Sequence, residues 1–113
     1  MKYEHSELAS GRWARMPLAE QMANIGSEVE RALNWQAKSN AEYTKKAFER
    51  ALELLDLTMA SVTNYAHIRE VARLREAIAD YFFGSNECNS TGASWRKYFM
   101  PFYYSVRAHP ITY

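Results

Sequence analysis

Three stretches of the chain repeat apolar side chains at steps of three and four residues, which is the spacing of one face of an α-helix. These stretches are Leu18–Ala37, Glu42–Met59 and Ile68–Phe83. Pro17 precedes the first of them, and a proline suits the first turn of a helix because its missing N–H would have no partner there. The pattern therefore predicts three main helices within residues 17–83.

Polar and glycine residues mark the expected ends of these helices. Ser39 followed three residues later by Glu42 is a capping-box pattern, which predicts the start of the second helix. Asn64 is the expected N-cap of the third helix, and Gly84 is its expected stop. Gly26 lies inside the first helix, where glycine costs about 1 kcal/mol relative to alanine. We interpret it as a point where a neighbouring helix comes close.

The two ends of the chain complete the predicted architecture. Residues 1–16 lack a sustained period and are expected to form an arm or a short helical turn leading to Pro17, anchored by Trp13. Residues 84–93 are rich in glycine, serine and asparagine and predict a loop. An aromatic helix is expected over 94–108, kinked or split by Pro101. The whole chain is therefore predicted to be one all-α domain, a small four-helix up-and-down bundle.

Composition limits the function classes. The chain has 113 residues, which suits a single core, and its net charge of +1 argues against a strongly electropositive nucleic-acid binder. Cys88 is the only cysteine, so no intramolecular disulfide can form and a reducing compartment is indicated. We find no apolar run typical of a signal peptide or a membrane span. These features predict a soluble, cytoplasmic protein without membrane contact.

Candidate chemistry is sparse. His67 and Glu70 are three residues apart and share one face of the third helix, so they offer two potential metal ligands. His5 and Glu7 in the arm are a weaker pair, because nothing near them completes a ligand set. A metal-dependent bundle enzyme would need carboxylates from other helices. The available ones are Glu28, Glu30, Glu49 and Glu53.

Two other catalytic classes fit the sequence poorly. HEPN ribonucleases are small helical bundles that place a histidine at a fixed short distance after an arginine, and no arginine of this chain has a histidine at that distance. Cys88 follows Glu87, a carboxylate that disfavours the reactive thiolate. We therefore predict no catalytic residue, no metal ligand and no cofactor. The metal-dependent enzyme stays as a third hypothesis, after the protein-contact and nucleic-acid-contact hypotheses given next.

The last helix suggests binding. Its aromatic residues exceed what one face of a short helix can bury, which predicts contact with a second copy or a partner protein. They are Trp95, Tyr98, Phe99, Phe102, Tyr103 and Tyr104. The alternative is nucleic-acid contact, in which rings stack on bases and cations meet phosphates. The candidate cations are Arg12, Arg15, Lys45, Lys46, Arg96, Lys97 and Arg107.

The third helix carries opposite charges at steps of three and four residues, including Arg73, Glu76 and Asp80. Two arrangements are open. The charges form pairs on the surface, or Arg73 or Arg75 joins a partly buried network with an acid of another helix.

Several segments resemble a family of short, uncharacterised bacterial helical proteins, and the similarity covers most of the chain. The matching segments are His5–Leu8, Pro17–Gln21, Ile25–Val29, Ala47–Thr58, Arg73–Glu76 and Asp80–Phe82. The resemblance is to proteins encoded beside reverse transcriptases of diversity-generating retroelements. It implies an accessory role in a reverse-transcriptase complex and brings no catalytic residues. We therefore expect a non-catalytic accessory protein that acts through protein contacts.

Overall fold

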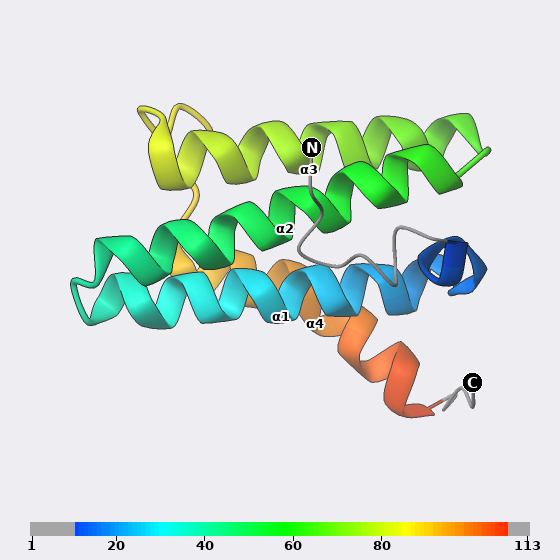
Figure 1. The fold of residues 1–113 in the computed structure, drawn as a ribbon, viewed down its shortest axis with the longest axis horizontal. Coiled ribbons are helices and arrows are strands. Elements are labelled where there is room, and N and C mark those ends of the chain that lie inside the picture. Colours follow the sequence, from blue (N-terminus) through cyan, green and yellow to red (C-terminus); the bar gives the residue numbers. More distant parts are fainter. Residues whose placement is uncertain (1–10, 109–113) are drawn as a thin grey trace.

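A computed structural model describes residues 11–108. Within this range the chain forms a short 3₁₀ helix, η2 (Trp13–Arg15), four α-helices and no strand. The α-helices are α1 (Leu18–Ala37), α2 (Ala41–Ser61), α3 (Tyr65–Phe83) and α4 (Gly92–Ala108). Each helix runs opposite to the one before it (Figure 1). The structure confirms the predicted small all-α bundle.

The turn between α1 and α2 differs from the prediction. Ser39 has a φ of 57°, and its N–H donates to Gln36 O at 3.0 Å while Asn40 N donates to Trp35 O at 3.0 Å. This hydrogen-bond pattern ends α1 with Ser39 in the left-handed conformation. The cap of α2 is Asn40, whose Oδ1 accepts from Tyr43 N at 3.0 Å. The prediction that Ser39 caps α2 is therefore wrong by one residue, because Ser39 already terminates α1.

The ends of α3 agree with the sequence. Asn64 Oδ1 accepts a hydrogen bond from His67 N at 3.2 Å, and Gly84 is the C-cap. The loop after α3 is shorter than predicted, because α4 begins at Gly92. Thr91 Oγ1 accepts from Ser94 N at 3.0 Å, which satisfies one of the free N–H groups at the start of α4.

Trp13 anchors the segment that precedes α1, as predicted. Its side chain is 1% exposed, and its Nε1 donates to Thr58 Oγ1 of α2 at 2.9 Å. Gln21 Nε2 donates to the backbone oxygen of Trp13 at 2.8 Å. The predicted pair His5 and Glu7 lies outside the described residues.

The core lies between the four helices. α2 and α3 lie close together where α2 connects to α3. They diverge toward the other end of the bundle, where α3 ends and the following loop begins (Figure 1). Aromatic rings occupy this wider end. The ring centroid of Phe48 lies 5.8 Å from the ring centroid of Phe82 and 4.7 Å from that of Phe83. The fully buried apolar side chains include Ile25, Val29, Leu55, Val71 and Ile78.

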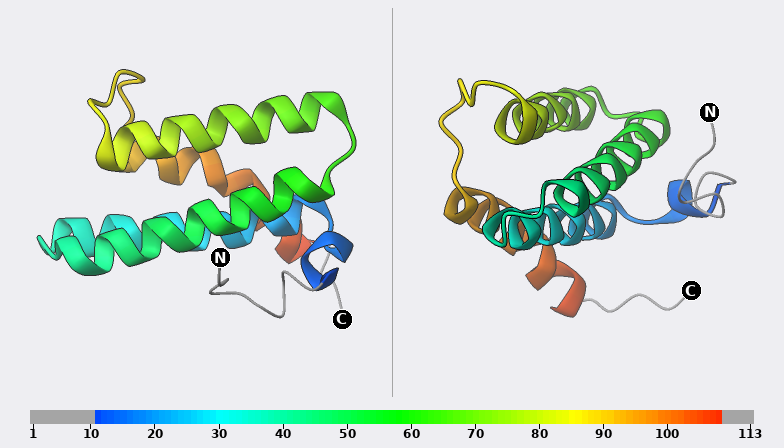
Figure 2. Two further views of the ribbon diagram at one scale, coloured as in Figure 1. Left: turned by 45° about the horizontal axis from the view of Figure 1, so that its top comes forward. Right: turned by 60° about the vertical axis from the view of Figure 1, so that its left-hand side comes forward.

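Gly26 is the point where α4 approaches α1. A Cβ atom built there would lie 2.8 Å from Phe99 Cδ1 and would also contact the Tyr103 hydroxyl. Figure 2 shows α4 alongside α1, and these two helices approach each other more closely than α3 and α4 do. The interpretation of Gly26 as a close-approach site is confirmed.

Pro101 lies inside α4. It has no N–H to donate to the preceding turn, and its ring crowds the carbonyl four residues earlier. The axis of α4 changes direction past its midpoint (Figure 1). The predicted kink is therefore present.

Candidate interaction surfaces

The predicted metal-ligand pair is not joined by further ligands. His67 and Glu70 are exposed on α3. Glu70 Oε1 instead accepts a hydrogen bond from the Tyr98 hydroxyl of α4 at 3.0 Å. Within residues 11–108, no three His, Cys, Asp or Glu side chains are grouped so that they could hold a metal ion.

Glu28, one of the carboxylates available for such a site, has a structural role. It is 6% exposed, and its Oε2 lies 3.0 Å from Arg50 Nε of α2 while its Oε1 lies 2.9 Å from Arg31 Nη1. Burial of a carboxylate is costly unless hydrogen bonds and opposite charges compensate it. The pair Glu28–Arg50 therefore joins α1 to α2, a role that sequence spacing alone did not indicate.

The charged residues of α3 take the surface arrangement. Arg73 and Glu76 are exposed. The ion pair to a neighbouring helix is made by Arg75, whose Nε lies 2.8 Å from Asp56 Oδ1, and both side chains are solvent-accessible. The predicted pairing of Arg75 with an acid of another helix is therefore confirmed, as a surface ion pair, whereas Arg73, Glu76 and Asp80 do not form a buried network.

Asp80 holds the loop that follows α3. Its carboxylate oxygens accept from the backbone N–H groups of Glu87 and Cys88, each at 3.0 Å. These hydrogen bonds lower the pKa of Asp80 because they favour the charged form. Desolvation, and then the Asp80 carboxylate, raise the pKa of the exposed Cys88 thiol. Cys88 is consequently a poor nucleophile in this setting.

The aromatic residues of α4 divide between core and surface. Trp95 and Phe99 are buried core residues, so the prediction that they line an external interface is corrected. Tyr98, Phe102 and Tyr103 are half-buried, and burial is the main cause of the raised pKa of Tyr98 and of Tyr103. Tyr104 alone of the predicted six has a largely exposed ring, at 62%.

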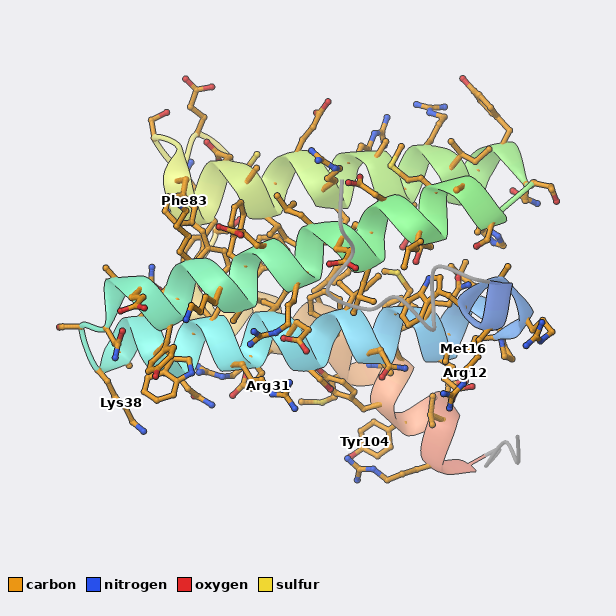
Figure 3. All side chains as sticks on the ribbon, viewed as in Figure 1. Arg12, Met16, Arg31, Lys38, Phe83 and Tyr104 are labelled. Atoms are coloured by element: carbon orange, nitrogen blue, oxygen red, sulfur yellow. The ribbon has the colours of Figure 1, made fainter. Side chains whose placement is uncertain are left out.

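Tyr104 belongs to a concave area between α1 and α4, which we call the α4 surface. It is lined by Ser27, Glu30, Arg96, Met100, Tyr103, Tyr104 and Arg107 and encloses about 440 Å³. Met100 is 49% exposed. Arg96 Nε lies 3.0 Å from both carboxylate oxygens of Glu30, and the Arg107 guanidinium lies 5.6 Å from the Tyr104 ring centroid. Tyr104 extends away from the bundle (Figure 3).

The predicted nucleic-acid cations are spread over three parts of the chain. Arg12 and Arg15 lie at the η2 turn, Lys45 and Lys46 lie on α2, and the others, Arg96, Lys97 and Arg107, lie on α4. Lys46 Nζ is 3.5 Å from Glu42 Oε1. The α4 surface unites only Arg96 and Arg107 of this set.

A second concave area, the α3–α4 groove, was not predicted. It encloses about 610 Å³ and is lined by Ala66, Arg69, Glu70, Arg73, Leu74, Ala77, Trp95 and Tyr98. It arises because α4 packs on α1 and α3 packs on α2, so that α3 and α4 approach each other less closely. The four-residue spacing of Arg69 and Arg73 was the only sequence signal for it.

Comparison with models of known families, with curated proteins and with solved structures found no match. None of the described helices is long and apolar enough to cross a lipid bilayer.

Proposed function

We propose that this chain is a non-catalytic accessory protein of the cytoplasm that binds a second protein through the α4 surface. The observation that supports this proposal is that Met100 and Tyr104 are both exposed. They lie one turn apart on α4 and line the same concave area. Tyrosine and methionine are enriched at protein interfaces, where a tyrosine ring offers a large contact area and a hydroxyl for one hydrogen bond.

The surroundings of these two side chains suit a protein partner. Arg96 and Glu30 form an ion pair at the edge, and Arg107 lies over the Tyr104 ring. An apolar centre with a charged edge is the usual arrangement of a protein interface. Partner contact would remove the exposed part of Met100 from water.

A different protein is a better occupant than a second copy. A two-fold symmetric contact pairs the same patch with itself. Each patch carries Arg96 and Arg107 against one carboxylate, Glu30, so two copies would face each other with a surplus of positive charge. A partner that presents acidic groups avoids this repulsion.

The resemblance to accessory proteins encoded beside reverse transcriptases gives the first partner to test. Binding to the reverse transcriptase of the same genome should be measured for the natural chain and for Tyr104→Ser and Met100→Ser. We expect each substitution to weaken binding about tenfold or more, as for a tyrosine at the centre of an interface. Tyr43→Ser is the matched control, because Tyr43 is also an exposed tyrosine but lies on α2. Equal binding by Tyr104→Ser and Tyr43→Ser would contradict the proposed surface.

Contact with single-stranded RNA is the second candidate, favoured by the Arg107 guanidinium beside the exposed Tyr104 ring. The two candidates differ in salt dependence. Release of counterions from phosphates makes RNA affinity fall steeply with salt, whereas an apolar protein contact responds weakly. A chain that binds RNA at low salt, loses this binding at moderate salt and does not bind the protein partner would favour RNA contact over protein contact.

A further inference from the structure

The α3–α4 groove combines an apolar floor with a cationic edge. Leu74 and Trp95 are each 5% exposed and form part of its lining, together with the small side chains of Ala66 and Ala77. Arg69 and Arg73 lie one helical turn apart on α3 and line the same groove.

Neither arginine of the groove is paired with a carboxylate of residues 11–108. Among the described residues, neither Arg69 nor Arg73 forms an ion pair, and the Arg69 guanidinium instead lies 5.8 Å from the Tyr65 ring centroid. Glu70 is the one acid of the groove lining, and its Oε1 accepts from the Tyr98 hydroxyl. The groove therefore carries more positive than negative charge.

Trp95, which also lines the groove, carries an unsatisfied donor. Trp95 Nε1 is buried and has no hydrogen-bond partner in the described part of the chain. A buried donor that is left unsatisfied costs about 1–3 kcal/mol, which is why most buried polar groups are paired. The donors that a ligand can reach in this groove are therefore the guanidinium groups of Arg69 and Arg73, which are exposed.

We infer that the α3–α4 groove binds an acidic segment of another protein. Carboxylates of the segment would pair with Arg69 and Arg73, and a small aliphatic side chain would cover Leu74 and Ala77. This site uses other residues of α4 than the α4 surface does, and it does not depend on Tyr104.

The test is titration of the full chain with a short acetylated and amidated peptide of alternating glutamate and leucine. The readout is the indole N–H resonance of Trp95 in ¹H–¹⁵N spectra, assigned by its loss in Trp95→Phe. We expect this resonance to shift while those of Trp13 and Trp35 stay in place. A peptide with glutamine in place of glutamate should bind much more weakly.

Variants separate the groove from general charge effects. Arg73→Gln should weaken peptide binding about fivefold, the effect of losing one partly exposed ion pair. Lys38→Gln removes the same charge at the α1–α2 turn and should leave binding unchanged. Tyr104→Ser should also leave it unchanged, which keeps this result separate from that for the α4 surface.

Three outcomes would overturn the inference. The first is no shift of the Trp95 resonance at millimolar peptide. The second is equal binding of the glutamine peptide. The third is a single-stranded RNA that shifts the same resonance at lower concentration than the acidic peptide does.

Discussion

Replacing Gly26 by alanine tests how α4 is seated on α1. The added Cβ would lie 2.8 Å from both Cδ1 and Cγ of Phe99, which is shorter than real contacts of this kind, so the ring and α4 must move. Overpacking of this type costs about 1–3 kcal/mol, and the better helix propensity of alanine returns about 1 kcal/mol. Because the contact is severe, we expect a net loss of about 1–2 kcal/mol in the free energy of unfolding.

Urea unfolding followed by circular dichroism measures this loss as a lower midpoint at constant slope. Combining Gly26→Ala with Phe99→Leu provides the control, since a smaller side chain at 99 leaves room for the Cβ. The double variant should lose less stability than the sum of the two single ones, by at least about 0.5 kcal/mol. Gly26→Ala with unchanged or increased stability would refute the close contact between α1 and α4.

Three further predictions concern single residues. Ser39→Gly should raise the free energy of unfolding by about 1 kcal/mol, measured with urea, because Ser39 has a φ of 57°; a lower stability would contradict this. Burial raises the pKa of Glu20 above 4.5, so its charged form costs stability as pH rises through the folded-state pKa. The free energy of unfolding in urea should therefore be the same for Glu20→Gln and the natural chain below pH 4.5, and higher for Glu20→Gln at neutral pH. A difference in stability between the two chains that does not change with pH would refute the burial of the charged form. Asp80→Asn should speed alkylation of Cys88 by iodoacetamide, because the Asp80 charge helps to raise the pKa of the thiol; an unchanged rate would show that desolvation alone protects it.

The apolar periodicity was sufficient to predict the four helices, because each helix buries one stripe of side chains. The anchor role of Trp13 and the α3 cap at Asn64 also followed from local sequence. Local patterns failed at Ser39, where the end of α1 and the start of α2 compete for adjacent residues. A cap signal alone does not show which helix uses the residue.

The surfaces were harder to predict, because they depend on which helices are neighbours. No local pattern indicated that Glu28 pairs with Arg50, since the two residues are on different helices. It also did not show that Trp95 and Phe99 face the core while Tyr104 faces outward. Gly26 leaves room for α4 to pack closely on α1, and α3 and α4 approach each other less closely, which leaves the groove between them.

Light scattering gives the most direct test of the proposed accessory role. The mass of the purified chain should be measured alone, with the reverse transcriptase of the same genome, and with single-stranded RNA, at low and moderate salt. We expect a complex with the reverse transcriptase that persists at moderate salt and is lost in Tyr104→Ser. A chain whose mass is unaffected by the protein but rises with RNA at low salt would contradict it.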